Sequence, residues 1–161
     1  MPSRSVRRIG IAALALVAVD GFALTSCSSD DSNPLFATDW TLTSAVDSGV
    51  PVDTSKGLPI HWRFLQDGGC GDTHLTCPDG QKLVGNDVCN DFVRDIQVDG
   101  DRVVWGTHWE STAVGCSGGL TETLRDFFFD ASFQYVVTGD QLKLTSSDGT
   151  IDLALHASHA R

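Results

Sequence analysis

The stretch "QYVVTGDQLKLTSSDGTIDLAL", residues 134–155, decides the fold that we expect for this chain. Apolar and polar residues alternate along it, and two pairs of turn residues, Gly139-Asp140 and Asp148-Gly149, interrupt the alternation. A period of two is typical of half-buried β-strands, and paired glycine and aspartate favour tight hairpin turns. The stretch therefore predicts three consecutive strands.

The same alternation occurs earlier in the chain. The segment "DFVRDIQVDGDRVVW", residues 91–105, predicts a hairpin around Asp99-Gly100. In "IHWRF", residues 60–64, the apolar side chains alternate with His61 and Arg63. In "DWTLTSA", residues 39–45, the pattern predicts one common face for three side chains, which are Trp40, Leu42 and Ser44.

One segment between these strands has the spacing of a helix. Its apolar positions recur every three or four residues, and Ser117 or Thr121 is the expected N-cap. The apolar stripe consists of Leu120, Leu124, Phe127, Phe128 and Ala131. Strands, one helix and three further strands predict an α+β domain: a curved, mostly antiparallel sheet or an open barrel closed by one helix.

The N-terminal residues predict a secretion signal. Three arginines precede an apolar run from Ile9 to Val19, which is shorter than the roughly 20 residues of a membrane-spanning helix. The following Leu-Thr-Ser-Cys, ending at Cys27, resembles a bacterial lipobox, in which the cysteine is lipidated and becomes the new N-terminus. We therefore expect a lipoprotein signal peptide at 1–26 and a protein bound to the cell membrane on its exported side.

The remaining chain divides into three parts. We expect a lipid-anchored flexible tether at 27–37, one domain at 38–157 and a disordered tail at 158–161. The formal net charge is −10, to which the signal segment contributes positive charge, so the domain itself is strongly acidic. Nucleic acid is excluded as an expected partner because phosphate contacts need clustered lysines and arginines.

The four cysteines after Cys27 are expected to form disulfides in an exported protein. Three pairings are possible, and we expect Cys70 with Cys77 and Cys89 with Cys116, with no free thiol in the mature domain. An alternative is a metal site formed by Cys70, His74 and Cys77, but the sequence offers no matching fourth ligand. We therefore expect no metal and no cofactor.

Several motifs follow one another in the order of a known family. These are "WTLTSA" (40–45), "GNDVCNDF" (85–92), "STAVGC" (111–116), "TETLRDFF" (121–128) and the stretch at 134–155 quoted above. This order resembles the META domain, also called HslJ-like, a small bacterial envelope module that often occurs on lipoproteins. The resemblance spans about residues 39–155, and the cysteine loop at 70–77 is an insertion beyond the usual pattern.

The resemblance implies structural roles more than an activity. On the family pattern lie Cys89, Asn90, Thr112, Cys116, Glu122, Gly139 and Leu142. The family has no established reaction, and its members are loosely associated with envelope stress and virulence. The resemblance therefore implies a stress-linked envelope role without catalysis.

The sequence carries one candidate acid–base pair, His108 with Glu110 in "WGTHWEST". No nucleophile motif accompanies it, and the pair fits a surface loop between a strand and the helix better than an active site. We expect no enzyme, and an uncharacterised envelope enzyme using His108 and Glu110 remains one alternative. A carrier of a small apolar or lipid ligand is another, which requires an apolar pocket of about 300 Å³ or more.

The expected function is binding or structural. The contact patch should lie where the loop 67–80 meets "WGTHWEST", because tryptophan is enriched at binding hot spots. Its expected members are Trp62, Trp105, His108 and Trp109. The expected partners are the membrane, through the lipid anchor, and an envelope protein, a wall component or a small apolar ligand.

Overall fold

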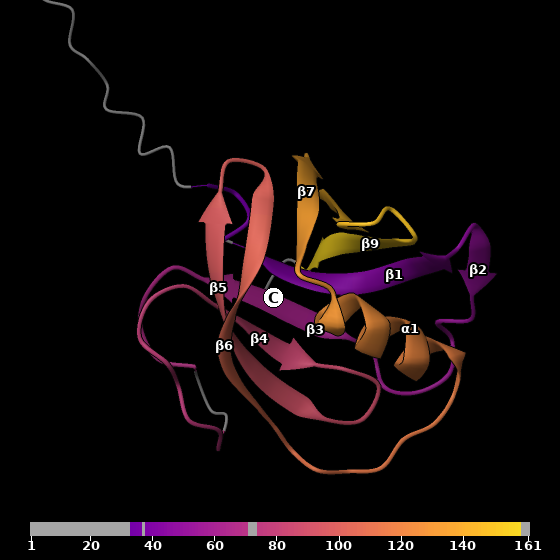
Figure 1. Ribbon diagram of the computed structural model, residues 1–161, viewed down its shortest axis with the longest axis horizontal. Helices are drawn as coiled ribbons and strands as arrows, with labels where there is room; N and C mark the ends of the chain where they lie inside the picture. The colour runs from indigo at the N-terminus through magenta and orange to yellow at the C-terminus, as the bar shows by residue number, and fades with distance from the viewer. Residues whose placement is uncertain (1–32, 37, 71–73, 159–161) are drawn as a thin grey trace, which may run out of the picture. The chain divides into compact units, whose positions relative to one another are not determined.

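The computed structural model describes residues 33–36, 38–70 and 74–158, all within the unit Ser32–Arg161 (Figure 1). The predicted signal peptide and Cys27 lie outside these ranges. The elements, in chain order, are β1 (Asp39–Asp47), β2 (Val50–Val52), β3 (His61–Leu65), β4 (Lys82–Asn86), β5 (Asp91–Asp99), β6 (Arg102–Ser111), α1 (Gly119–Phe129), β7 (Ser132–Thr138), β8 (Gln141–Ser146) and β9 (Ile151–Ser158). The stretch at residues 134–155 forms β7, β8 and β9, as predicted.

The strands form a closed antiparallel barrel. Neighbours along the sheet run β1-β3-β4-β5-β6-β7-β8-β9, and β9 pairs again with β1 to complete eight strands. The closing register extends from Asp39 opposite Ser158 to Asp47 opposite Ile151, and β2 forms a short hairpin with β1 outside the ring. The antiparallel sheet and the single helix are confirmed, whereas an open sheet edge is wrong because β1 and β9 cover each other's backbone groups.

A β-bulge in β1 changes which of its side chains face the core, so the predicted face is wrong for Ser44. The pairing with β9 shifts between Leu42 and Ser44, so the alternation of side chains changes phase at that point. Trp40 and Leu42 point into the core as predicted, but Ser44 is exposed and Ala45 is buried in its place.

The helix α1 buries the predicted stripe through Leu120, Leu124, Phe127 and Phe128. Ala131 lies beyond the helix end and is exposed. The N-cap is Gly118, and within the described chain no side chain caps this end, so the expected caps Ser117 and Thr121 are wrong.

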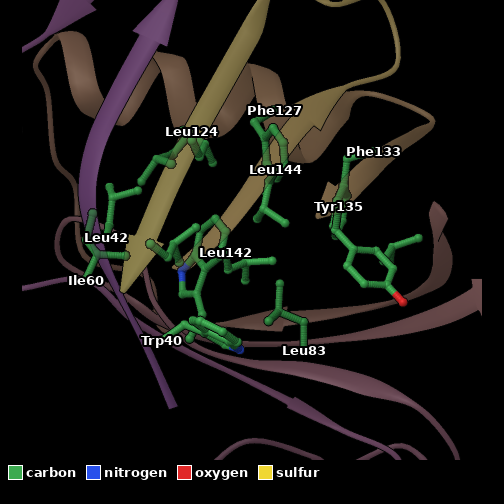
Figure 2. Close-up of a cluster of buried hydrophobic side chains, with 14 of the residues drawn as sticks. Trp40, Leu42, Ile60, Leu83, Leu124, Phe127, Phe133, Tyr135, Leu142 and Leu144 are labelled. Atoms are coloured by element: carbon green, nitrogen blue, oxygen red, sulfur yellow. The ribbon is translucent and has the colours of Figure 1, made fainter. Parts of the chain in front are cut away.

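The barrel interior is filled by side chains. One buried cluster draws residues from all eight barrel strands and from α1, and Trp40, Trp62 and Phe127 are among its largest fully buried members. Leu124 and Phe127 face the same interior as Leu142 and Leu144 in Figure 2. Dense packing of this kind is typical of a protein core.

The domain begins earlier than predicted. Leu35 is fully buried, and its carbonyl accepts a hydrogen bond from Trp40 Nε1 at 3.2 Å. Asn33 Nδ2 donates to the Tyr135 hydroxyl at 2.6 Å. Residues 33–36 therefore belong to the packed domain and not to the end of the tether. Ser158 is likewise the last residue of β9, so only 159–161 of the expected tail lie outside the described residues.

Candidate functional site

The predicted contact patch does not form one surface. Trp62 and Trp105 are core residues with only 1% and 9% of their surface exposed, so they cannot act as exposed anchors. Trp62 stacks on Phe127 at 6.1 Å, and its Nε1 donates to the Asn86 carbonyl at 3.0 Å. The other two patch residues lie next to each other on β6 and therefore point to opposite faces of the sheet.

Trp109 forms an aromatic surface with the end of α1. Its ring stacks on Phe129 at 5.8 Å with 20° between the planes, and meets Phe128 edge-on at 5.3 Å. Trp109 is 38% exposed and Phe129 is 76% exposed. We call the pair Trp109 and Phe129 the aromatic shelf. The sequence did not single out Phe129, although it lies off the apolar stripe of the helix and so had to face outward.

Arg94 of β5 lies against this shelf. Its Cζ is 4.3 Å from the Trp105 ring centroid and 4.7 Å from that of Trp109, and its Nη1 donates to the Phe128 carbonyl. Burial lowers the pKa of Arg94 to about 10, against the opposing effect of Asp95. Cation–π contacts of this kind strengthen when the cation is desolvated, so Arg94 supports the shelf from the protein side.

His108 faces the cysteine loop instead. The backbone N–H of Thr76 donates to Glu110 Oε2 at 2.9 Å, and His108 Nε2 lies 3.3 Å from the Thr76 carbonyl oxygen. The structure thus brings Thr76, in the described part of the loop 67–80, against "WGTHWEST", as the sequence predicted. Both side chains of the candidate acid–base pair bind loop backbone.

The environment of Glu110 weakens it as a base. Hydrogen bonds from Thr76, from its side chain first and then its backbone, together with the proximity of His108, lower the pKa of Glu110. A general base for use near neutral pH needs a raised pKa instead. Among the hydrogen bonds of the described chain, the His108 ring makes none with a serine, threonine or cysteine side chain, and the contact of Glu110 with Thr76 is the one that lowers its pKa.

The four cysteines lie at disulfide distance in the expected pairs. The Cα atoms of Cys70 and Cys77 are 5.5 Å apart, and those of Cys89 and Cys116 are 6.5 Å apart. His74 of the alternative metal site is exposed, and among the described residues no three histidine, cysteine or acidic side chains are placed to hold an ion.

Several hollows exceed the size that a small-ligand carrier requires, but they lie on the outer surface. One of about 550 Å³ lies over β3 and β4 beside His61 and Arg63. Another of about 420 Å³ lies between Cys89, Cys116 and the start of α1.

Cys89 and Asn90, which we call the "CN" motif, join the turn between β4 and β5 to the segment after β6. Asn90 contacts the segment 112–118 that leads into α1, and Thr112 Oγ1 accepts a hydrogen bond from the Asp91 N–H at 3.1 Å. The META domain family matches residues 33–158, which is most of the chain. The chain belongs to the META domain family. The family resemblance noted in the sequence is confirmed, and the match begins at the same Asn33 that contacts the barrel.

Two solved structures have a fold similar to that of this chain. One is an NMR structure of a protein from Burkholderia xenovorans, with 17% sequence identity and a TM-score of 0.55. The match covers 79% of this chain and 86% of that chain. A second NMR structure has 17% identity and a TM-score of 0.52, and covers 76% and 91% respectively. A comparison with curated proteins finds no match. Across the described residues, no helix has the length and hydropathy needed to span a membrane.

Proposed function

We propose that this META domain protein is a lipid-anchored component of the bacterial cell envelope that works by binding a partner, without catalysis. The anchor is Cys27, and the contact surface is the aromatic shelf of Trp109 and Phe129. An envelope protein or a wall component is the expected partner, in keeping with the stress-linked role that the family resemblance implies.

The exposure of Phe129 is the observation that carries the binding role. The core buries most large apolar side chains almost completely, whereas Phe129 leaves 76% of its surface in solvent next to a tryptophan. Adjacent exposed aromatic rings on a rigid support are typical of protein contact sites. The support is rigid because Phe128, directly before Phe129, is buried between Trp62, Trp105 and Trp109.

The absence of catalysis is supported by the contacts of the one acid–base pair. His108 and Glu110 both bind the backbone of Thr76, and the pKa of Glu110 is lowered. The carrier alternative is weaker, because the apolar side chains that would have lined an internal pocket pack against one another in the barrel.

Site-specific photo-crosslinking in cells tests the binding role. A photoreactive phenylalanine analogue replaces Phe129 in one variant and Val136 in a matched control, which is 59% exposed on β7. We expect a discrete crosslinked product from position 129 that is absent from position 136, and its loss when Trp109→Ala is added. Identical products from both positions, or none from position 129, would contradict the proposed surface.

A further inference from the structure

The two cysteine pairs have different surroundings. Cys70 is only 7% exposed and packs with Val84 and Val93 in a small apolar cluster outside the barrel. Cys89 and Cys116 are both partly exposed, and both line the hollow of about 420 Å³. A small molecule that enters this hollow therefore reaches both residues of the second pair, whereas in the first pair Cys77 is partly exposed and Cys70 is covered.

The hollow has the size and lining of a small-molecule site. Its volume lies within the range of ligand pockets, and its lining combines apolar side chains with the charged side chains of Asp53 and Lys56. The walls come from three separate segments through Val52, Val88 and Leu120.

Cys116 lies close in sequence to the start of α1. It lies two residues before Gly118, the N-cap of α1, and no side chain of the described residues caps that end. The positive end of a helix lowers the pKa of a nearby thiol, and a thiol of lower pKa leaves faster in disulfide exchange. A thiolate released at Cys70 would instead lie among the apolar side chains of Val84 and Val93, which solvate a charge poorly.

The length of chain that each disulfide encloses also favours faster reduction of Cys89–Cys116. The pair Cys70–Cys77 is separated by 7 residues in sequence, whereas Cys89–Cys116 is separated by 27. Closing a short loop costs less entropy, so once opened the shorter pair closes again more readily.

We propose that the disulfide Cys89–Cys116 exchanges with low-molecular-weight thiols that enter this hollow. A thiolate attacks Sγ of Cys89 and forms a mixed disulfide, while the S–S bond breaks and its electron pair leaves with Cys116 as a thiolate. A second thiolate attacks the mixed disulfide at the small-molecule sulfur and releases Cys89. Two small thiols are thereby oxidised to one disulfide, and the two cysteines are reduced and take up the two protons.

This exchange gives the protein a redox-dependent segment. The disulfide ties Cys116, in the connection between β6 and α1, to the turn between β4 and β5. Its reduction removes the covalent tie at the start of α1, the helix whose buried face packs against the barrel core.

Differential alkylation with mass spectrometry tests the proposal on the folded protein, with glutathione as the probe. We expect Cys89 and Cys116 to become alkylated about tenfold faster than Cys70 and Cys77, with a transient glutathione adduct on Cys89. Equal rates, faster reduction of Cys70–Cys77, or an adduct confined to Cys116 would overturn the proposal.

A charge variant separates leaving-group chemistry from stability. Ser117→Asp places a negative charge beside Cys116, where it disfavours the thiolate while remaining compatible with the helix N-terminus. We expect glutathione to reduce this variant about two- to threefold more slowly, with no loss of thermal stability. The control Thr107→Asp, an exposed position on β6, should leave the rate unchanged. An unchanged rate in Ser117→Asp, or an equal slowing in both variants, would overturn the role of Cys116.

Discussion

Asn90 binds the backbone of Val114 from both of its polar groups. Its Oδ1 accepts from the Val114 N–H at 2.7 Å, and its Nδ2 donates to the Val114 carbonyl at 3.1 Å. The side-chain amide thus replaces a strand neighbour for a segment that is not in a strand. Because Cys89 bonds to Cys116 in the same segment, adjacent residues of the "CN" motif fix it covalently and through hydrogen bonds.

Substituting Asn90 should destabilise the domain measurably. Asn90→Ala removes both hydrogen bonds, and we expect the free energy of unfolding to fall by about 1–2 kcal/mol. Asn90→Asp keeps an acceptor for the Val114 N–H but turns a carboxylate oxygen toward the Val114 carbonyl, so it should cost at least as much. Urea unfolding followed by tryptophan fluorescence measures both variants.

The control is the side chain of Val114, because Asn90 bonds only to the backbone of that residue. Val114 is 57% exposed, and Val114→Ala should change the free energy of unfolding by less than about 0.5 kcal/mol. Wild-type stability of Asn90→Asp would show that the donated hydrogen bond has no role.

Gly85 of β4 should tolerate no side chain. A Cβ at this position would lie 2.1 Å from the His61 carbonyl oxygen and 2.8 Å from Trp62 Cδ1. We expect Gly85→Ala to cost about 3 kcal/mol, because strand β3 and a core tryptophan would both have to move.

Gly115 provides the matched control, since its Cβ would meet no heavy atom within 4 Å. Thermal unfolding of Gly115→Ala should match the wild type. Similar melting temperatures for the two alanine variants would contradict the close approach of β4 to β3.

Local sequence patterns predicted the strands, but they did not predict that the sheet closes into a barrel. Alternation and the turns at Gly139 and Gly149, which have φ values of 61° and 75°, were enough to predict β7, β8 and β9. The pairing of β9 with β1 joins segments a hundred residues apart, and no local pattern encodes it. The fold class was therefore predictable from the sequence, whereas the closed barrel was not.

The candidate site was predicted only in part. The contact between the cysteine loop and "WGTHWEST" was expected, and alternation already placed Trp62 on the same face as Phe64, so its burial could have been inferred. The position of Arg94 over the Trp105 and Trp109 rings could not have been inferred in this way. The register of β5 against β6 shifts between Arg94 and Ile96, and the extra residues lie on β6, where Gly106 is a sign of a bulge but does not say which way Arg94 points.

Protonation of Glu110 should loosen the cysteine loop. Its hydrogen bonds with Thr76 lower its folded-state pKa below the usual 4.5, so the stabilising effect is complete above about pH 4.5 and is lost as the pH falls through the lower value. Glu110→Gln keeps an acceptor but cannot ionise. We expect its free energy of unfolding to lie below the wild-type value at neutral pH and to converge with it in acid.

Denaturant titrations between pH 2.5 and 7 check this convergence. Glu122→Gln in the first turn of α1 serves as a control that removes the same charge elsewhere. A gap between wild type and Glu110→Gln that persists or widens in acid would contradict the contact with Thr76.

Lipidation of Cys27 is the central claim about where this protein acts, and palmitate labelling in the producing bacterium tests it most directly. The full-length wild type should incorporate labelled palmitate and sediment with membranes, because two acyl chains anchor a protein stably. Cys27→Ser should lose the label and leave the membrane fraction, whereas the control Cys77→Ser should retain both. Equal labelling and membrane partition of wild type and Cys27→Ser would contradict the account.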